Sequence, residues 1–171
     1  GNFELTVTPV NDAPVLVDLS SGATAEDTSL TITLSAADVE GNELTYSGES
    51  NNENVTVSVI GDELTMAPAF NYNGSAIITV TVSDGELMDS ETFVLVVAPG
   101  NDSPTINLPE SFTFDEDGSL SHDFSTYVSD IDEDDLTLTA SNNTNVTVTI
   151  SGLQVTFGAG ADWNGSETIT F

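Results

Sequence analysis

Two copies of one repeat, each about 90 residues long, make up almost the whole sequence. Asn11-Asp12-Ala13-Pro14 returns as Asn101-Asp102-Ser103-Pro104, 90 positions later. Glu26-Asp27 returns as Glu116-Asp117 at the same spacing. Later matching positions are 91 or 92 residues apart, which indicates small loop insertions in the second copy. Because a repeat of this length corresponds to one small domain, the chain is expected to fold as two similar domains in series.

The repeat also predicts how the chain is divided. Residues 10–100 form the first repeat and residues 101–171 form the second. Phe171 aligns with Val80, so the second repeat is expected to lack its last hairpin and its last strand. Residues 1–9 are expected to be an orphan copy of such a last strand, because they align with residues 91–99 at a spacing of 90. The matching residues of this segment are Phe3, Leu5, Val7 and Pro9.

Two interpretations of residues 1–9 remain open. In the first, they end a preceding repeat, and the 171 residues are a window on a longer array. In the second, they are a donor strand that pairs with the unpaired edge of the second repeat of another molecule. The partners are then neighbouring copies of the chain, or adjacent repeats, joined end to end.

Several segments alternate apolar residues with Thr or Ser, which is typical of strands with one buried face. Asn-Gly and Asp-Gly pairs interrupt these segments, as turns between antiparallel strands do. No segment has the apolar spacing of an amphipathic helix. The sequence therefore predicts an all-β fold of tandem antiparallel β-sandwiches, with roughly seven strands in each repeat. The clearest strands are expected at Ser29–Leu34, Asn54–Val59, Ala76–Val82, Leu136–Thr139 and Val146–Ile150.

The charge of the chain is extremely one-sided. It contains 29 acidic residues, no Lys or Arg, and one His, which gives a formal net charge of -29. Phosphate binding depends on Lys and Arg, so nucleic acid is excluded as a direct partner, and an anionic membrane would repel the chain. The longest apolar run, Phe93–Ala98, is far shorter than the roughly 20 residues of a membrane helix, so no direct membrane insertion is expected.

The expected strand order sorts many acidic and amide residues to the ends of the sandwiches. One end of the first repeat carries Asn11, Asp12, Asp38, Glu40 and Asp84. Its other end, next to the linker, carries Glu26, Asp27, Asn71 and Asn73. The linker and the adjoining end of the second repeat carry Asn101, Asp102, Asp130, Asp132 and Asp134. The far end of the second repeat carries Glu116, Asp117, Asp162 and Asn164.

Calcium is the expected cofactor at these ends. Clustered carboxylates repel one another, and the chain has no Lys or Arg to offset that repulsion. Ca²⁺ binds six to eight oxygen ligands from carboxylates, amides and backbone carbonyls, which this composition supplies. The run from Asp130 does not form an EF-hand loop, because the sixth position is Asp135 and the twelfth is Ser141. The alternative is an acidic surface that serves only salt tolerance.

The motifs jointly resemble the cadherin-like tandem repeats of large bacterial surface adhesins. They are Pro9-Val10-Asn11-Asp12-Ala13-Pro14, Glu26-Asp27-Thr28, the Asp38-x-Glu40 turn with Leu44-Thr45-Tyr46, Asn71-x-Asn73-Gly74-Ser75 and Val82-Ser83-Asp84-Gly85. The resemblance implies Ig-like domains joined end to end by calcium in extracellular or cell-surface stalks. It implies ligands from the first repeat, the linker and the second repeat: Glu26, Asn71, Asn73, Asn101, Asp102, Asp130 and Asp132.

The chain is therefore expected to be a structural protein and not an enzyme: a calcium-rigidified adhesin stalk or fibre subunit. His122 is the only histidine, without a second metal-binding His or Cys, and is expected to be an exposed loop residue. The alternative function is a carbohydrate-binding module that binds surface glycans. Trp163 and its counterpart Tyr72 would be the aromatic residues for it, although both are expected to pack on the cores.

Overall fold

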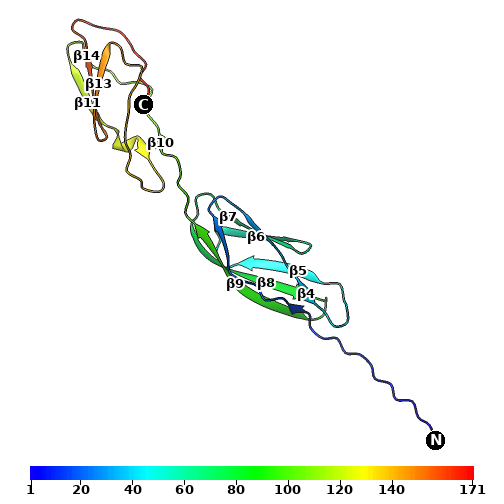
Figure 1. The fold of residues 1–171 in the computed structure, drawn as a ribbon. Coiled ribbons are helices and arrows are strands. Elements are labelled where there is room, and N and C mark those ends of the chain that lie inside the picture. Colours follow the sequence, from blue (N-terminus) through cyan, green and yellow to red (C-terminus); the bar gives the residue numbers. More distant parts are fainter. The chain divides into compact units, whose positions relative to one another are not determined.

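Two β-sheets face each other in the first unit of the computed structural model, which describes residues 1–171 (Figure 1). The chain divides into a first unit, residues 1–100, and a second unit, residues 101–171. Apart from one short 3-10 helix, η1 (Phe124–Thr126), all regular structure is β. The predicted all-β fold of tandem sandwiches is confirmed. No helix is long and apolar enough to span a membrane.

Nine strands build the first unit. One sheet has the strand order β2-β9-β8-β5, and the other has the order β3-β7-β6, while β1 and β4 form a separate pair. The strands are β1 (Val15–Leu16), β2 (Gly22–Ala25), β3 (Leu30–Thr33), β4 (Ala36–Ala37), β5 (Thr45–Ser50), β6 (Val55–Ile60), β7 (Glu63–Pro68), β8 (Gly74–Ser83) and β9 (Met88–Ala98).

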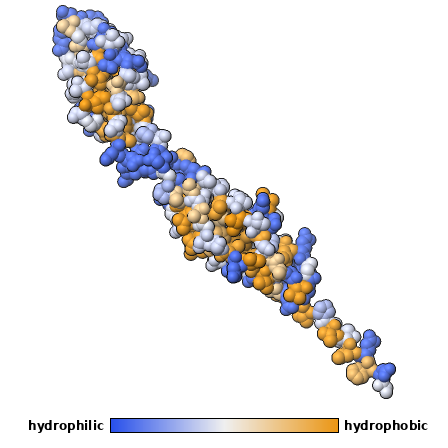
Figure 2. All heavy atoms as spheres, in the orientation of Figure 1, coloured by the Kyte–Doolittle hydropathy of each residue, from blue (hydrophilic) through white to orange (hydrophobic).

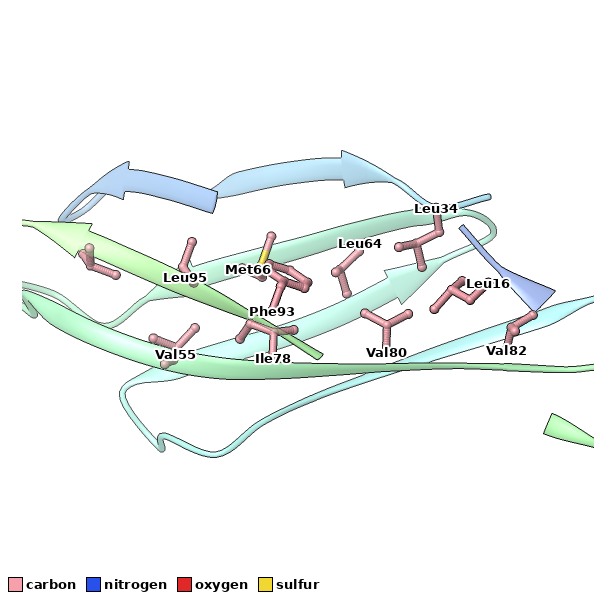
Figure 3. Close-up of a cluster of buried hydrophobic side chains, with 12 residues drawn as sticks. Leu16, Leu34, Val55, Leu64, Met66, Ile78, Val80, Val82, Phe93 and Leu95 are labelled. Atoms are coloured by element: carbon pink, nitrogen blue, oxygen red, sulfur yellow. The ribbon is translucent and has the colours of Figure 1, made fainter. Parts of the chain in front are cut away.

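The core of the first unit lies between its two sheets. Because side chains alternate along a strand, every second residue of β8 and β9 points inward. From the opposite sheet, Leu64 and Met66 of β7 are fully buried against them. Figure 3 shows these side chains gathered between the strands. The expected strands near residues 29–34, 54–59 and 76–82 are confirmed as β3, β6 and β8.

One strand pair of the first unit corrects the prediction of a purely antiparallel sandwich. β2 pairs with β9 in parallel, from Gly22 with Leu95 to Ala25 with Ala98. The chain first pairs with β4 through β1. It then enters the four-stranded sheet as β2, which runs beside β9 in the same direction. As a consequence, β2 and β9 end side by side next to the linker.

The second unit repeats one of these sheets. Its sheet β11-β14-β13 corresponds to β3-β7-β6, and its pair β10-β12 corresponds to β1-β4. Its core contains Phe124, Val146, Val155 and Phe157. The strands are β10 (Thr105–Ile106), β11 (Ser119–Asp123), β12 (Val128–Ser129), β13 (Val146–Ser151) and β14 (Gln154–Ala159).

The other sheet of the second unit is not formed, and the strand predicted at residues 136–139 is absent. Only a single bridge between Ser141 and Thr170 marks the place where the counterparts of β5 and β8 meet. In the first unit β8 lies between β5 and β9, and β2 pairs only with β9. Residues 101–171 contain no counterpart of β9, so the strands that depend on it are not held in place.

The expectation that His122 is an exposed loop residue is wrong. His122 lies on β11 and is half-buried, with its Nε2 2.9 Å from the Tyr127 hydroxyl. Its ring also stacks on the Tyr127 ring, with a centroid distance of 5.6 Å. The residue is therefore part of the aromatic packing of the second unit.

Candidate functional site

The most enclosed acidic side chain of the first unit is Glu26, which follows β2. Its N–H donates to the carbonyl of Ala98 at 2.9 Å, and its carboxylate accepts a hydrogen bond from the N–H of Gly100. Only 7% of Glu26 is exposed. A buried carboxylate normally has a cationic partner or a metal ion, and the chain contains no Lys or Arg. The parallel pairing of β2 and β9 thus encloses a carboxylate at the linker end of the unit.

Asp27 follows Glu26 in sequence, and Asn71 is joined to Asp27 by a hydrogen bond. The Asn71 N–H donates to Asp27 Oδ1 at 2.9 Å, and both backbones are left-handed, with φ values of 54° and 57°. The Asn71 Oδ1 atom is buried and has no hydrogen-bond donor. Asn73, which was predicted to join this cluster, is exposed and makes no hydrogen bond through its side chain.

These groups fit a hard divalent cation. The buried Glu26 carboxylate and the undonated Asn71 Oδ1 are oxygen acceptors that lack a protein partner of positive charge. Calcium prefers such carboxylate and amide oxygens, whereas nitrogen and sulfur ligands, which favour transition metals, are absent from this cluster. Glu26, Asp27 and Asn71 are therefore the residues of the first unit that would hold an ion here.

The linker end of the second unit has its own acidic turn. The Asp102 N–H donates to Asp132 Oδ2 at 2.7 Å. Asp130 Oδ1 accepts the N–H of Asp132 at 2.9 Å and that of Asp134 at 3.4 Å. Asn101 Nδ2 donates to the carbonyl oxygen of Asp102 at 2.9 Å. The second unit thus brings together all five residues that the sequence placed at this end.

The opposite end of the first unit uses the same arrangement of turn and linker. The Asp12 N–H donates to Glu40 Oε2 at 3.2 Å, as Asp102 does to Asp132. Asn11 Nδ2 donates to Asp84 Oδ2 at 2.8 Å. Here too the structure brings the sequence-predicted residues into one network.

Two carboxylates of this network differ in their hydrogen bonding. Asp84 accepts hydrogen bonds from the N–H groups of Leu87 and Glu86, each at 2.7 Å. These two bonds, together with the hydrogen bond from the Asn11 side chain, lower the pKa of Asp84. Asp38 Oδ1 accepts the Asn42 N–H at 2.8 Å, but Asp38 Oδ2 is buried without a donor. Asp38 therefore provides the only undonated buried oxygen at this end.

Sequence reasoning missed Asn42 as a member of this network. Its Nδ2 donates to Asn11 Oδ1 at 2.9 Å, and its N–H binds Asp38. The repeat contained the signal, because Asn42 is the counterpart of Asp134 at a spacing of 92.

The far end of the second unit is more open than its counterpart. The Asp162 N–H donates to Asp117 Oδ1 at 3.1 Å, which repeats the Asp27–Asn71 pair. Glu116 is exposed, although its counterpart Glu26 is buried, because residues 101–171 contain no strand equivalent to β9 to cover it. Asn164 is also exposed and is not joined to these residues.

The two aromatic residues beside the Asn-Gly turns pack against their cores. Tyr72 is half-buried, and its hydroxyl accepts from Asn52 Nδ2 at 2.6 Å. A Cβ added at Gly74, where φ is 146°, would lie 2.7 Å from that hydroxyl. Trp163 packs on the second core in the same way and lies over Gly165. These contacts use the rings for packing and do not favour a sugar-binding platform.

Comparison with known proteins agrees with the fold. A profile of the family described as bacterial Ig domain matches residues 11–96 and 101–171. No curated protein sequence matches the chain. The solved structure of human protocadherin-24 EC1-2, form II, aligns with a TM-score of 0.51 and 18% identity, over 93% of this chain and 86% of that one.

Two further structures align less well. An endo-fucoidan hydrolase of glycoside hydrolase family 107, MfFcnA4, gives a TM-score of 0.43 and 19% identity over 91% of this chain. The match covers 25% of the hydrolase, so the chain spans a quarter of its length. Titin domain M7 gives a TM-score of 0.37 and 14% identity over 53% of this chain and 98% of that domain.

Proposed function

The chain belongs to the bacterial Ig domain family, and we propose that it is a non-enzymatic structural repeat of an extracellular adhesin stalk or fibre, rigidified by calcium at its domain ends. The tandem sandwiches supply the structural element of such a stalk. In the fibre form, copies of the chain join head to tail by strand complementation.

The observation that carries the proposal is the buried Glu26. Its carboxylate receives a backbone N–H but no cationic side chain, and no Lys or Arg exists in the chain. Burial of an unpaired carboxylate costs several kcal/mol. A calcium ion offsets that cost. Asn71 Oδ1, which accepts no hydrogen bond, provides a further oxygen ligand.

The linker connects this site to the acidic turn of the second unit. Gly100, which donates to Glu26, precedes Asp102 by two residues, and Asp102 donates to Asp132. When bound, calcium supplies positive charge that both sets of carboxylates require. Calcium bound to either set would order the residues on its own side of the linker, and this order supports the rigidity that a stalk needs.

Melting with and without calcium tests the proposal. Calcium that binds only the folded chain stabilises it by about 2.7 kcal/mol per site at a hundredfold excess over Kd. The net charge of -29 means that any salt stabilises the fold, so the chelator sample is matched in ionic strength with NaCl, and a third sample contains Mg²⁺. Equal melting temperatures in calcium and in chelator would refute the calcium role.

Substitutions at the linker separate the proposed site from general charge relief. Asp102→Asn together with Asp130→Asn should remove most of the calcium-dependent shift in melting temperature while both units stay folded. Asp135→Asn together with Glu133→Gln removes the same number of charges from exposed residues of the same turn and should leave the shift unchanged. Equal effects of the two changes would attribute the shift to net charge alone.

A further inference from the structure

A hydrogen-bonded turn of residues 69–72 carries Asn71 in the first unit. The Tyr72 N–H donates to the carbonyl of Ala69 at 3.1 Å, and Asn71 between them has a φ of 54°. Figure 2 shows hydrophilic side chains gathered around the linker, at this end of the unit. Phe70, the apolar residue of the turn, is 81% exposed, so its side chain does not anchor the turn in the core. The position of Asn71 therefore depends on how Ala69 and Tyr72 are held.

The loop between β5 and β6, residues 51–54, holds both ends of this turn. The Ala69 N–H donates to the carbonyl of Asn54 at 2.7 Å. At the other end, the Tyr72 hydroxyl accepts a hydrogen bond from Asn52 Nδ2 at 2.6 Å. The backbone of one loop residue and the side chain of another thus fix the first and last residues of the turn.

Asn52 is the central residue of this loop. Its Nδ2 also donates to the carbonyl of Ser75 at 3.1 Å, and its Oδ1 accepts the Asn54 N–H at 3.0 Å. Its own N–H donates to Ser50 Oγ at 3.1 Å. The Tyr72 hydroxyl in turn donates to the Ser75 carbonyl at 3.2 Å. Because both the oxygen and the nitrogen of the Asn52 amide are hydrogen-bonded, the orientation of this side chain is fixed.

The second unit offers a comparison. Asn143 and Trp163 stand in the places of Asn52 and Tyr72, at a spacing of 91. The turn itself is repeated, because the Trp163 N–H donates to the carbonyl three residues earlier at 3.1 Å. A Trp side chain has no hydroxyl that could accept a hydrogen bond from Asn143. The second unit therefore forms the turn without such a bond, whereas the first unit has the bond beside Asn71.

Asn71 depends on a fixed position more than its counterpart Asp162 does. A carboxylate attracts a cation over several ångströms, whereas a neutral amide oxygen acts only at contact. Asn71 Oδ1 is buried without a donor, and the Asn71 N–H donates to Asp27 Oδ1 at 2.9 Å. A group that is already held in its bound conformation loses little freedom on binding, so a fixed turn strengthens the binding of an ion.

We propose that Asn52 is a positioning residue for calcium in the first unit. Through its bond to the Tyr72 hydroxyl, it fixes the turn that presents Asn71 Oδ1 to the ion. Asn52 does not bind the ion itself, because its own Oδ1 accepts hydrogen bonds from Asn54. This inference rests on the proposed calcium role and assigns the residue that prepares one of its ligands.

Amide hydrogen exchange in chelator, measured by NMR, tests whether the bond holds the turn. Tyr72→Phe removes the hydroxyl and keeps the ring. The matched control is Tyr46→Phe, because Tyr46 is a half-buried residue of β5 whose hydroxyl makes no hydrogen bond. Exchange of the amides of residues 69, 71 and 72 should be at least tenfold faster in Tyr72→Phe. It should be unchanged in Tyr46→Phe.

Calcium titration followed at the Asn71 amide tests whether the bond positions a ligand. Tyr72→Phe should weaken calcium binding at this turn about fivefold, the effect of losing one hydrogen bond. The calcium response of the Asp84 amide, at the opposite end of the unit, should be unchanged. A general loss of stability does not lower the affinity of a chain that stays folded, so a loss confined to Asn71 indicates positioning.

A double variant tests whether the two side chains act together. Asn52→Ala should weaken calcium binding at Asn71 at least as much as Tyr72→Phe does. Asn52→Ala combined with Tyr72→Phe should weaken it no further than Asn52→Ala alone, because both changes break the same bond. Fully additive losses would overturn the assignment to this bond.

The outcomes separate this inference from the calcium proposal. Equal exchange and equal affinity at Asn71 in the original chain, Tyr72→Phe and Tyr46→Phe would overturn the inference alone. Faster exchange with unchanged calcium affinity would also overturn it, because the bond would then serve only the fold. If the Asn71 amide of the original chain does not respond to calcium, the calcium proposal fails at this end, and the inference fails with it.

Discussion

The backbone N–H of Asn71 donates to Asp27 Oδ1 at 2.9 Å, and both residues have left-handed backbones. Asp162 and Asp117 repeat this bond in the second unit at 3.1 Å, again with positive φ at both residues. Among residues with a Cβ atom, Asn and Asp adopt this conformation most readily. The pair joins the loop after β2 to the loop before β8 and holds the backbone beside Glu26.

Asp27→Ala should lower the free energy of unfolding of the first unit by about 1 kcal/mol, because it removes the acceptor and places Ala at φ 57°. Asp27→Asn keeps an acceptor and a residue that tolerates this backbone, so it should cost less. Urea unfolding in chelator, followed by circular dichroism, measures both. Asp117→Ala is the matched change in the second unit. An unchanged unfolding midpoint for Asp27→Ala would show that the pair does not contribute to stability.

Four strands of the two units could be predicted from the sequence because each has one face that is more buried than the other. The alternation in residues 76–82 predicted β8, and the same pattern predicted β3, β6 and β13. The pattern at residues 136–139 is equally regular but forms no strand. A strand needs a neighbour to bond, and the neighbours of this segment depend on a strand that residues 101–171 do not contain.

The end clusters could be predicted only in part. Strand order alone placed Asp130, Asp132 and Asp102 at the same end, and the structure joins them by hydrogen bonds. The parallel pairing of β2 with β9 could not be inferred from alternation, which says which face is buried but not the direction of the neighbouring strand. The burial of Glu26 follows from that pairing, so it was not predictable either.

Leu64→Ala should destabilise the first unit alone. Leu64 is fully buried between the sheets, and removal of such a side chain costs about 2–5 kcal/mol. Trp163, the only Trp, lies in the second unit, so its fluorescence reports that unit separately. Circular dichroism should show an earlier transition, while the fluorescence transition stays in place. A matching shift in the fluorescence transition would show that the units do not unfold independently.

Acid should weaken the second unit through Glu167. The N–H of Val146, with those of Thr144 and Asn145, holds the pKa of Glu167 below its ordinary value of 4.5. Stability from this carboxylate is therefore present above the unfolded pKa and is lost as the pH falls through the folded pKa. Urea unfolding followed by Trp163 fluorescence should show wild type more stable than Glu167→Gln at neutral pH, with the difference shrinking in acid. Glu110→Gln, at an exposed residue, should show no such trend, and a constant Glu167→Gln difference would contradict the assignment.

Glu26→Gln should have opposite consequences with and without calcium, and Glu49→Gln should have neither. In chelator, the change removes an unpaired buried charge, so the melting temperature of the first unit should stay equal or rise. In calcium, it removes a charged ligand and should weaken calcium binding about tenfold, or about 1.4 kcal/mol. Glu49 is an exposed residue of β5 outside the predicted calcium ends, so it controls for the loss of one negative charge. Calorimetric titration and melting of the three chains measure these effects. If the Glu26→Gln chain is less stable in chelator and binds calcium normally, Glu26 stabilises the fold and does not bind an ion.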